Sequence, residues 1–514
     1  MENNKEKKLL LQISNLRQYF PVGKDQFVKA NDGISIDIYE GETFGLVGES
    51  GCGKSTLGRS ILQLYKQTDG RTMYFGRSID EIAPKYAYET FRNLNARRSA
   101  MQEAQKKYDA FREKYDAMSE QEQYAAHTEM VTLRKEARDA MLDITTLIGG
   151  LVVAEDLKSV EEVYLREYEQ SKQLRKAEER RQDIQLDIDD ALYAAEKAEK
   201  AGKDSASHKA KLDKARAKMA QCEKNIADIK AKIDSIHGDI DVLRRRWSGE
   251  PHYEEYEAHR TSGIDLARLT YDEMRSLRSD LQLIFQDPYS SLNSRMTVGQ
   301  IIGEGMIAHK YFRRNDDRMK EEIIRVMEEC GLAPYFLHRY PHQFSGGQRQ
   351  RIGIARSLAL RPKFVVCDEA VSALDVSIQA QIINLLQDLK EKQNLTYLFI
   401  THDLSVVKYI SDRIGVMYLG TMVETAPSDD VFAHPLHPYT EALLNAIPTT
   451  DEKLENGPEI LEGDIPSPVN PPKGCKFHTR CKYCTEICTK VVPQMEEVRP
   501  NHFVACHHIL EGNK

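Results

Sequence analysis

The chain has 514 residues, of which 41% are hydrophobic and 30% are charged, so we expect about two to four globular domains with additional polar helix. A formal net charge of −8 excludes a general attraction for nucleic acid or anionic lipid. No run approaches about 18 consecutive apolar residues, and the opening residues lack the order of a signal peptide. We therefore expect the protein to stay in the cytosol.

Short β-branched runs separated by turn residues occupy the first part of the chain. Strands are expected at residues 9–13, 28–30, 34–38 and 43–47. The last of these strands runs directly into a glycine-rich loop. This order is typical of the start of a nucleotide-binding α/β domain.

The glycine-rich loop has the spacing of a phosphate-binding loop and lies between an expected strand and an expected helix. Its glycines let backbone N–H groups face the phosphates, and the positive end of the following helix adds to the attraction. Lys54 would reach the outer phosphates, and the hydroxyl of Ser55 would ligate Mg²⁺. The predicted nucleotide-binding residues are Gly48, Ser50, Gly51, Gly53, Lys54, Ser55 and Thr56. By itself, the loop predicts only a nucleoside triphosphate.

A long region without proline lies between Pro84 and Pro251, and we predict a helical insertion over residues 88–262. Residues 86–147 are helical but less regular. The second half carries two apolar stripes with spacings of three and four, which predict an antiparallel coiled-coil hairpin with a turn at 201–204. Arms of roughly 40 residues would extend about 60 Å. One stripe contains Leu212, Ala215, Met219, Cys222, Ile226, Ile229, Ile233, Ile236, Ile240 and Leu243, and the other contains Leu174, Ala177, Ile184, Ile188, Ala191, Ala195 and Ala198.

Alternating strand and helix signals return over residues 281–423. Within them, residues 363–369 have the pattern of a buried strand that ends in two acids. Asp368 would hold Mg²⁺, through water or together with Ser55, and Glu369 would polarise the attacking water. An acid pair at a strand end can also cap the next helix, but its position after a phosphate-binding loop favours the catalytic interpretation.

Residues 344–351, Phe-Ser-Gly-Gly-Gln-Arg-Gln-Arg, closely resemble the signature of ABC ATPases. The resemblance implies an α/β fold, the ABC ATPase cassette, with a RecA-like core and antiparallel β and helical subdomains. It also implies that ATP is sandwiched between two ATPase domains. The residues that would contact the γ-phosphate bound on the opposite subunit are Ser345, Gly346, Gly347 and Gln348.

Further motifs of the family follow in order. Gln286 matches the glutamine that senses Mg²⁺ and the attacking water, and His402 matches the switch histidine that contacts the γ-phosphate. The resemblance therefore implies that Glu369, His402 and Gln286 are catalytic. It assigns Mg²⁺ to Ser55, Gln286 and Asp368.

The same resemblance assigns a role to Asp375, which matches the loop that crosses the dimer interface. Phe20, or its neighbour Tyr19, would stack on adenine, although an ordinary packing role for either ring stays open. One departure from the family is Ala370, which follows the catalytic acid where proline is usual. Alanine removes a rigid turn without changing charge, so Glu369 should still act.

Residues 286–293, 371–381 and 434–440 look specifically like the ATPases of peptide importers. This resemblance implies that ATP hydrolysis powers the uptake of oligopeptides or dipeptides. The implied partners are a second, related ATPase subunit, two transmembrane permease subunits and, indirectly, an extracytoplasmic solute-binding protein. The implied location is the cytoplasmic face of the cell membrane, as a peripheral subunit, and no nucleic acid is expected.

The C-terminal part is rich in cysteine, and crowded thiols in a cytosolic chain favour metal ligation over disulfides. In the family, this tail resembles a [4Fe–4S] site held by four thiolates, which fall here on Cys475, Cys481, Cys488 and Cys506. Cys484 is a fifth thiol that could replace one of them. Zinc is the alternative, because four thiolates satisfy its tetrahedral preference and several histidines lie nearby.

The predicted domains are the N-terminal cassette part at 1–87, the insertion at 88–262, the C-terminal cassette part at 263–430 and the cysteine-rich region at 431–514. Two other functions stay open: a coiled-coil ABC ATPase acting on DNA, and an importer for a metal chelate or a sugar. Against the first, the turn at 201–204 carries no C-x-x-C zinc hook. The hairpin is either a solvated accessory arm or a docking arm for a partner.

Overall fold

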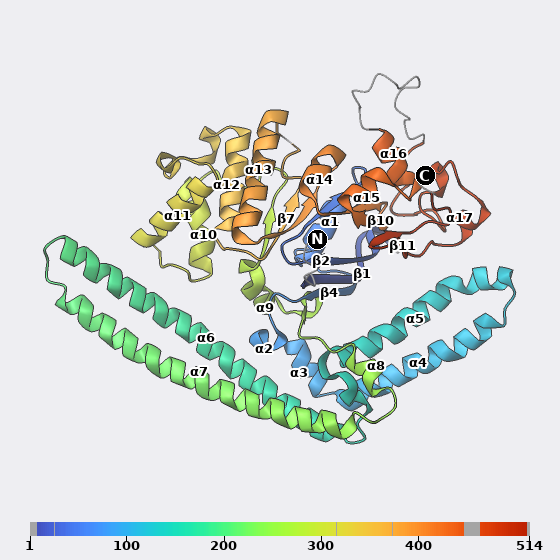
Figure 1. Cartoon of the computed structure of the whole chain (residues 1–514), viewed down its shortest axis with the longest axis horizontal. Helices are drawn as coiled ribbons and strands as arrows, with labels where there is room; N and C mark the ends of the chain where they lie inside the picture. Colours follow the sequence, from blue (N-terminus) through green and yellow to red (C-terminus); the bar gives the residue numbers. More distant parts are fainter. Residues whose placement is uncertain (1–7, 25, 315, 373, 447–462, 511–514) are drawn as a thin grey trace.

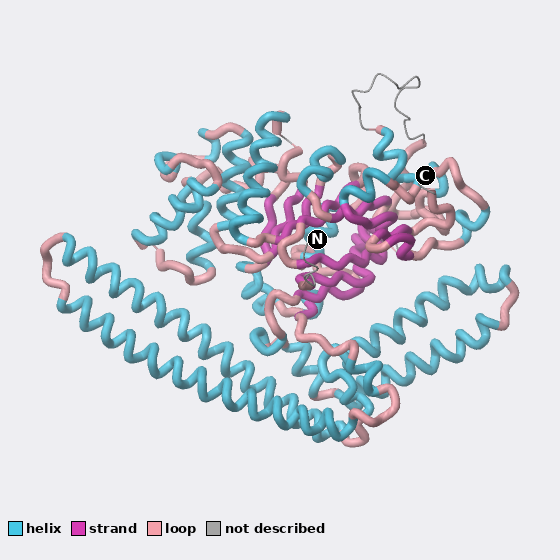
Figure 2. The backbone as a smooth tube through the Cα atoms, viewed as in Figure 1, coloured by secondary structure: helices cyan, strands magenta, loops and turns pink. Residues whose placement is uncertain are grey.

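The computed structural model describes residues 8–24, 26–314, 316–372, 374–446 and 463–510. A mixed α/β body carries two long helical hairpins, which extend from a common root in opposite directions (Figure 1). The strands gather at the centre of the body, whereas the hairpins contain only helix and short loops (Figure 2). Within the described ranges, no helix has both the length and the apolar character needed to cross a membrane.

The body is built on a sheet of eight strands in the order β11-β12-β10-β9-β3-β8-β7-β6. Pairing is parallel from β9 to β6, and β10, β12 and β11 extend the sheet in antiparallel fashion. The strands are β3 (Thr43–Val47), β6 (Leu281–Ile284), β7 (Phe364–Asp368), β8 (Thr396–Ile400), β9 (Arg413–Tyr418), β10 (Thr421–Pro427), β11 (Glu496–Arg499) and β12 (His502–Val504). β3, β7 and β8 are buried along their whole length, as expected for parallel strands covered on both faces.

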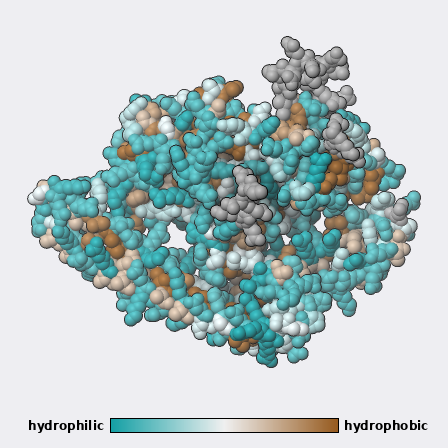
Figure 3. All heavy atoms as spheres, in the orientation of Figure 1, coloured by the Kyte–Doolittle hydropathy of each residue, from teal (hydrophilic) through white to brown (hydrophobic). Residues whose placement is uncertain are grey.

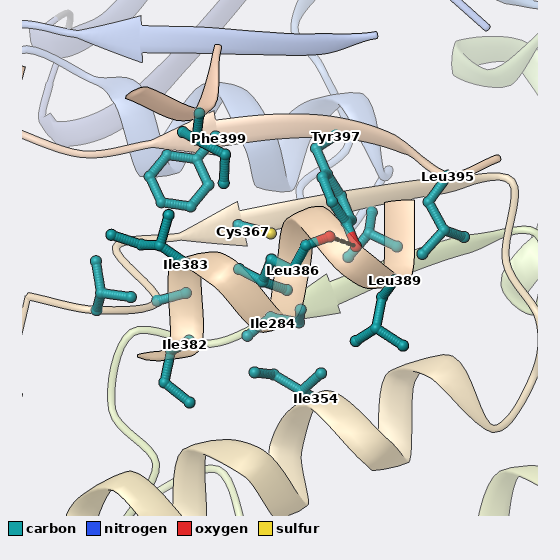
Figure 4. Packing of buried hydrophobic residues seen from close by; sticks show 14 of the residues in the cluster. Ile284, Ile354, Cys367, Ile382, Ile383, Leu386, Leu389, Leu395, Tyr397 and Phe399 are labelled. Atoms are coloured by element: carbon teal, nitrogen blue, oxygen red, sulfur yellow. Dashed lines mark hydrogen bonds between the residues drawn. The ribbon is translucent and has the colours of Figure 1, made fainter. Parts of the chain in front are cut away.

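Helices pack against this sheet. Figure 4 shows α13 (Val376–Gln393) lying along β7 and β8, where Leu386 meets Cys367 and the hydroxyl of Tyr397 donates to the Leu386 carbonyl at 3.2 Å. The other helices of the body are α1 (Lys54–Ile61), α9 (Tyr271–Ser276), α10 (Val298–Ala308), α11 (Asp317–Glu329), α12 (Gly346–Leu358), α14 (Leu404–Ile410), α15 (Ser428–Ala433), α16 (Pro438–Asn445) and α17 (Glu486–Lys490).

A second, antiparallel sheet has the strand order β2-β1-β4-β5. Its strands are β1 (Leu9–Gly23), β2 (Gln26–Tyr39), β4 (Asp69–Tyr74) and β5 (Ile264–Asp265). Tyr74 at the end of β4 pairs with Ile264 in β5. The chain therefore leaves this sheet and returns to it at adjacent points, and everything between the two strands is a helical excursion that begins with α2 (Ile79–Ile82) and α3 (Lys85–Phe91).

The longer hairpin consists of α6 (Leu157–Lys200) and α7 (Ala206–Trp247), joined by residues 201–205. The apolar stripe expected on α7 is buried from Leu212 to Ile240, and on α6 its partners Ala177, Ile184 and Ala191 are buried. The visible surface of this hairpin is mainly hydrophilic, with a few hydrophobic side chains among the polar ones (Figure 3). Spacings of three and four place the apolar side chains of each helix along one line, so burying that line against its partner holds the two arms together.

A second hairpin, formed by α4 (Leu94–Asp116) and α5 (Glu120–Ile148), extends the other way from the same root. The α4 arm buries few apolar side chains, since Leu94 and Met101 are its buried residues, whereas α5 also buries Ile144 and Ile148. At the root, a hydrophobic cluster unites α3, α5, α6, α7 and the short helix α8 (Tyr253–Glu257) around residues such as Phe91, Tyr164 and Trp247. This cluster fixes where both hairpins begin.

Helix α6 also contacts the body along the loop between α10 and α11. Lys310 pairs with Asp183 at 2.9 Å, and Lys197 pairs with Asp317 at 2.5 Å. Arg313 and Arg318 of the body both reach Asp190 of the hairpin. We name this row of ion pairs the α6 contact.

Residues 463–510, the tail, pack against the edge of the large sheet. β12 extends that sheet by pairing with β10, and His502 Nε2 lies 2.7 Å from Glu424 in the buried interface. Glu424 also accepts hydrogen bonds from the backbone N–H groups of Leu436 and His437. The tail is thus joined to the body through the sheet and through buried polar groups.

Candidate functional site

The glycine-rich loop lies between β3 and α1, as the sequence predicts. Gly51 and Gly53 have φ angles of 80° and 103°, which strain other residues, and a Cβ on Gly53 would lie 2.1 Å from the Ala30 carbonyl oxygen. Lys54 is buried, and its ammonium donates to the carbonyls of Gly48 at 2.7 Å and Glu49 at 3.0 Å. The loop thus curls around a cation at the start of a helix, an arrangement suited to phosphate.

Asp368 ends β7 beside this loop. Its side chain is buried, and Oδ2 accepts from Arg59 of α1 at 3.2 Å. The other oxygen, Oδ1, is buried and has no hydrogen-bond partner within the described part of the chain. A buried carboxylate oxygen without a partner is a position that a metal-bound water can satisfy. The residue therefore fits the predicted Mg²⁺ site, with Ser55 at the start of α1.

The three predicted catalytic residues come together after β6, β7 and β8. The Gln286 amide donates to Glu369 Oε2 at 2.6 Å, and His402 Nδ1 lies 3.6 Å from Glu369 Oε1. Glu369 has φ 46°, a left-handed conformation that is rare for a residue with a side chain. Strained backbone of this kind is frequent at functional sites. The arrangement sets one carboxylate between an amide and an imidazole.

The two aromatic candidates for adenine stacking lie side by side in β1. The Tyr19 hydroxyl donates to Asp32, and burial raises the pKa of Tyr19. Phe20 packs edge-on against Tyr65, with ring centroids 5.3 Å apart. The Tyr65 hydroxyl accepts from Arg59, so Phe20 is linked through two contacts to the partner of Asp368.

The signature residues form the N-terminal cap and the first turn of α12. Ser345 caps the helix by accepting from the Gln348 backbone N–H, while the Gln348 side chain accepts from the Ser345 N–H. Gly347 lies so close to Ile378 that a Cβ there would be 2.5 Å from a methyl carbon. Ser345 and Asp375 are exposed. An exposed helix start is available to phosphate on another molecule.

The tail reaches the phosphate-binding loop, which sequence patterns did not reveal. The Arg480 guanidinium forms a two-pronged pair with Glu49, at 2.7 and 3.1 Å. The Glu49 backbone N–H also donates to the hydroxyl of Tyr439, in α16 before the tail, at 2.9 Å. Lys476 of the tail pairs with Asp32 of β2 at 3.1 Å. The loop is thus held from outside by residues more than 380 positions later in the chain.

The five tail cysteines are grouped, and the thiol of Cys484 interacts with those of Cys488 and Cys481. Burial raises the pKa of the Cys475 thiol to about 11 and that of Cys506 to about 12, and in both cases the neighbouring thiols Cys481 and Cys488 add to the effect. The Cys475 N–H donates to the Cys488 carbonyl at 2.8 Å, whereas Cys484 is exposed. Within the described residues, no three of these sulfurs approach within 4.8 Å of one another.

A phosphate-binding loop, together with a buried and a half-buried acid at the end of another parallel strand of the same sheet, defines a nucleoside triphosphatase of the P-loop class. Comparison with known proteins identifies the family within this class. The profile of the ABC transporter family matches residues 31–223 and 248–372, and that of the oligopeptide/dipeptide transporter C-terminal region matches residues 423–488. The chain belongs to the ABC transporter family.

Curated relatives agree with this assignment. The oligopeptide transport ATP-binding protein AppF of Bacillus subtilis is 52% identical over 250 residues, which are 48% of this chain and 75% of AppF. The oligopeptide transport ATP-binding protein OppF of Salmonella typhimurium is 53% identical over 249 residues, 48% of this chain and 73% of OppF. The protein YkfD of Bacillus subtilis is 35% identical over 500 residues, which cover 97% of this chain and 95% of YkfD.

Proposed function

We propose that the chain is the ATP-binding and ATP-hydrolysing subunit of an ABC importer that powers the uptake of oligopeptides or dipeptides through a membrane permease. The observation that carries the proposal is the match of residues 423–488 to the C-terminal region of oligopeptide/dipeptide transporters. The names of AppF and OppF point the same way. The subunit would be peripheral, on the cytoplasmic face of the membrane.

In the proposed mechanism, Lys54 and the loop N–H groups bind the phosphates, and Ser55 and Asp368 hold Mg²⁺ together with Gln286. Glu369 accepts a proton from the attacking water, while Gln286 and His402 orient that water and the γ-phosphate. The 2.6 Å contact between Gln286 and Glu369 supports this grouping. A pre-aligned base of this type contributes about 10²–10⁴-fold to the rate.

A second ATPase subunit would complete the site. Ser345, Gly346, Gly347 and Gln348 present an exposed helix start that would meet the γ-phosphate bound on the partner, with Asp375 at the interface. The exposed rings of Phe285 and Tyr289, which follow β6, would contact the permease. Since Gln286 lies beside them, closure of the ATP site would move the permease contact.

The proposal also covers the insertion at residues 88–262. We assign α6 and α7 as an antiparallel coiled coil, supported by the buried stripe from Leu212 to Ile240. AppF is the shorter protein, because the same match spans 75% of AppF and 48% of this chain. The α6 contact favours a hairpin that is attached to its own body along one side over a wholly solvated arm.

For the tail we propose a [4Fe–4S] cluster on Cys475, Cys481, Cys488 and Cys506. Four thiolates could hold either zinc or an iron–sulfur cluster. The resemblance of this tail to the cluster site of the peptide-importer ATPases favours the cluster. When bound, such a cluster supplies a one-electron redox centre and cross-links the tail.

Iron and sulfide analysis of anaerobically purified protein tests the cluster. We expect iron with a broad visible absorbance, lost in Cys475→Ser and Cys488→Ser and kept in Cys484→Ser, the matched control at the exposed thiol. Stoichiometric zinc without iron in the unaltered protein would contradict the cluster and favour the zinc alternative.

Transport by the purified complex tests the function. The complex would be captured through this chain with its permease and second ATPase subunit, placed in proteoliposomes, and supplied with ATP and the solute-binding protein. We expect ATP-dependent uptake of labelled dipeptides or oligopeptides, lost in Lys54→Ala and kept in Lys66→Ala, an exposed control lysine. Uptake of a sugar or metal chelate in place of peptides, or DNA-stimulated hydrolysis without a permease, would overturn the proposal.

A further inference from the structure

A cavity of about 310 Å³ lies at the root of the long hairpin, apart from the nucleotide site. Its walls come from α2, α3, α5, α6, α7 and residues 260–262, so it lies where the long hairpin meets the rest of the insertion. Ala83, Phe91 and Ile240 line its apolar side. Its polar side contains Asp80, Glu167, Ser171 and His237.

Three of these polar side chains converge. The nearest ligand atoms of Asp80, Glu167 and His237 all lie within 4.8 Å of one another. His237 Nε2 is 2.6 Å from Glu167 Oε1, whereas no hydrogen bond to the Asp80 carboxylate occurs within the described residues. Each residue comes from a different helix, so the grouping results from the tertiary structure and not from one helical face.

An unpaired polar atom lies in the same cavity. Ser171 is 2% exposed, and its Oγ has no hydrogen-bond partner in the described part of the chain. It stands one helical turn after Glu167 on α6, so both side chains lie on the same face. A buried hydroxyl without a partner is costly, and a water or ligand in the cavity would satisfy it.

The surrounding charges are compatible with a cation. Asp80 and Glu167 bring two carboxylates to one half-buried site, where their ligand oxygens lie within 4.8 Å of each other. Two like carboxylates held close together in a half-buried site are stabilised by a positive ion between them. Two guanidiniums also line the cavity. Arg244 donates to the Tyr164 hydroxyl at 3.1 Å and lies 3.8 Å from Asp241, and Arg260 donates to Glu257 at 2.6 Å.

We propose that Asp80, Glu167 and His237 form a binding site for a divalent transition-metal ion, of which zinc is the occupant that the ligand set favours. One imidazole and two carboxylates suit zinc, whereas magnesium and calcium prefer sites made of oxygen alone. Metal–ligand bonds of about 2.0–2.2 Å hold ligand atoms roughly 3.5 Å apart, so the observed grouping requires only small side-chain movements. A water in contact with Ser171 completes the coordination.

The site would join α2 to both helices of the long hairpin. Zinc would therefore fix the angle at which the hairpin leaves the body and would stabilise the folded root by mass action. Because none of the three ligands touches the phosphate-binding loop, ATP binding does not require the metal.

Metal titration of the full-length protein tests the site. After removal of loosely bound metal, Co²⁺ would be titrated with the tail cluster in place. We expect one equivalent with the weak visible bands of nitrogen and oxygen ligation and without the intense thiolate charge-transfer band that binding to tail cysteines would give. Zinc should displace this cobalt.

Variants decide between a metal site and a simple Glu–His ion pair. Asp80→Asn, Glu167→Gln and His237→Gln should each weaken zinc binding by at least about tenfold, the minimum seen when even an outer partner of a ligand is lost. Asp239→Asn, which removes an exposed acid of α7 paired with Arg166, is the matched control and should bind normally. Asp80→Asn is the decisive variant, because it leaves the Glu167–His237 contact intact. Equal zinc affinity in Asp80→Asn and unaltered protein, or cobalt spectra of thiolate type alone, would overturn the proposal.

Discussion

Glu369 shows how a single residue position is fixed without the proline that usually follows it. The backbone N–H of Glu369 donates to the Ile400 carbonyl at 3.0 Å, and its carbonyl accepts from the Ser372 hydroxyl at 3.0 Å. These bonds hold the left-handed φ of 46° although the next residue is Ala370. The turn after the acid is therefore held by hydrogen bonds from β8 and from the following loop.

Arg480 provides a prediction at the same scale. Its guanidinium is the side-chain partner of Glu49, and Arg480→Gln would leave a carboxylate free to repel the phosphates. We expect the KM for ATP to rise about tenfold, which corresponds to about 1.4 kcal/mol, with little change in kcat. Steady-state ATPase kinetics at several ATP concentrations would measure both constants.

The control is Arg499→Gln, an exposed arginine of the same tail. It should leave KM unchanged. If Arg480→Gln lowered kcat at unchanged KM, the proposed role in positioning the phosphate-binding loop would be wrong.

Among the elements, the two hairpins differ in how far sequence could reveal them. The long one has a regular apolar stripe, and residues such as Ile226, Ile229 and Ile233 are buried where the spacing places them. The short one was expected only as irregular helix, because α4 buries little beyond Leu94 and Met101. Its position depends on the root cluster, whose contacts join residues far apart in the chain.

The α6 contact predicts a salt-sensitive hairpin. Single exposed ion pairs contribute little, but a row of them acts on one rigid helix, and added salt screens them together. Asp187 of α6 also pairs with Arg313. We expect Asp183→Asn, Asp187→Asn and Asp190→Asn, combined, to release the hairpin from the loop between α10 and α11. Distance measurements between spin labels near residue 203 and on α11 would then lengthen and broaden.

A matched triple variant, Asp213→Asn, Asp228→Asn and Asp234→Asn, removes three exposed acids from α7. At low salt, the distance between the two spin labels in this variant should equal that in the unaltered protein. An unchanged distance in the α6 variant would mean that packing, and not charge, sets the hairpin position.

At the scale of the whole molecule, the sequence predicts those features that depend on residues close together in the chain. The loop at Lys54, the acids after β7 and the capped start of α12 are local motifs, and each stands in the expected structural context. The Arg480–Glu49 pair and the grouping of Asp80, Glu167 and His237 are contacts across the fold. No single sequence pattern encodes such contacts, so only the structure reveals them.

The connection of the insertion leads to a prediction for the whole chain. β4 and β5 pair directly at Tyr74 and Ile264, so replacing residues 78–262 by a short turn should keep the antiparallel sheet. We expect the shortened protein to bind ATP and hydrolyse it within about threefold of the full chain, since no catalytic residue is removed. Lost complex assembly with retained ATPase activity would identify the insertion as a docking arm, and loss of ATP binding would contradict the separation of the two parts.

The most direct test of the central claim is the turnover of Glu369→Gln in the complete complex. Glutamine keeps the size of the side chain and removes the base, so the ATPase rate should fall by about 10²–10⁴-fold while ATP remains bound. Glu391→Gln, an exposed position on α13, should hydrolyse ATP normally. Turnover of Glu369→Gln at a rate close to that of the unaltered complex would contradict the account.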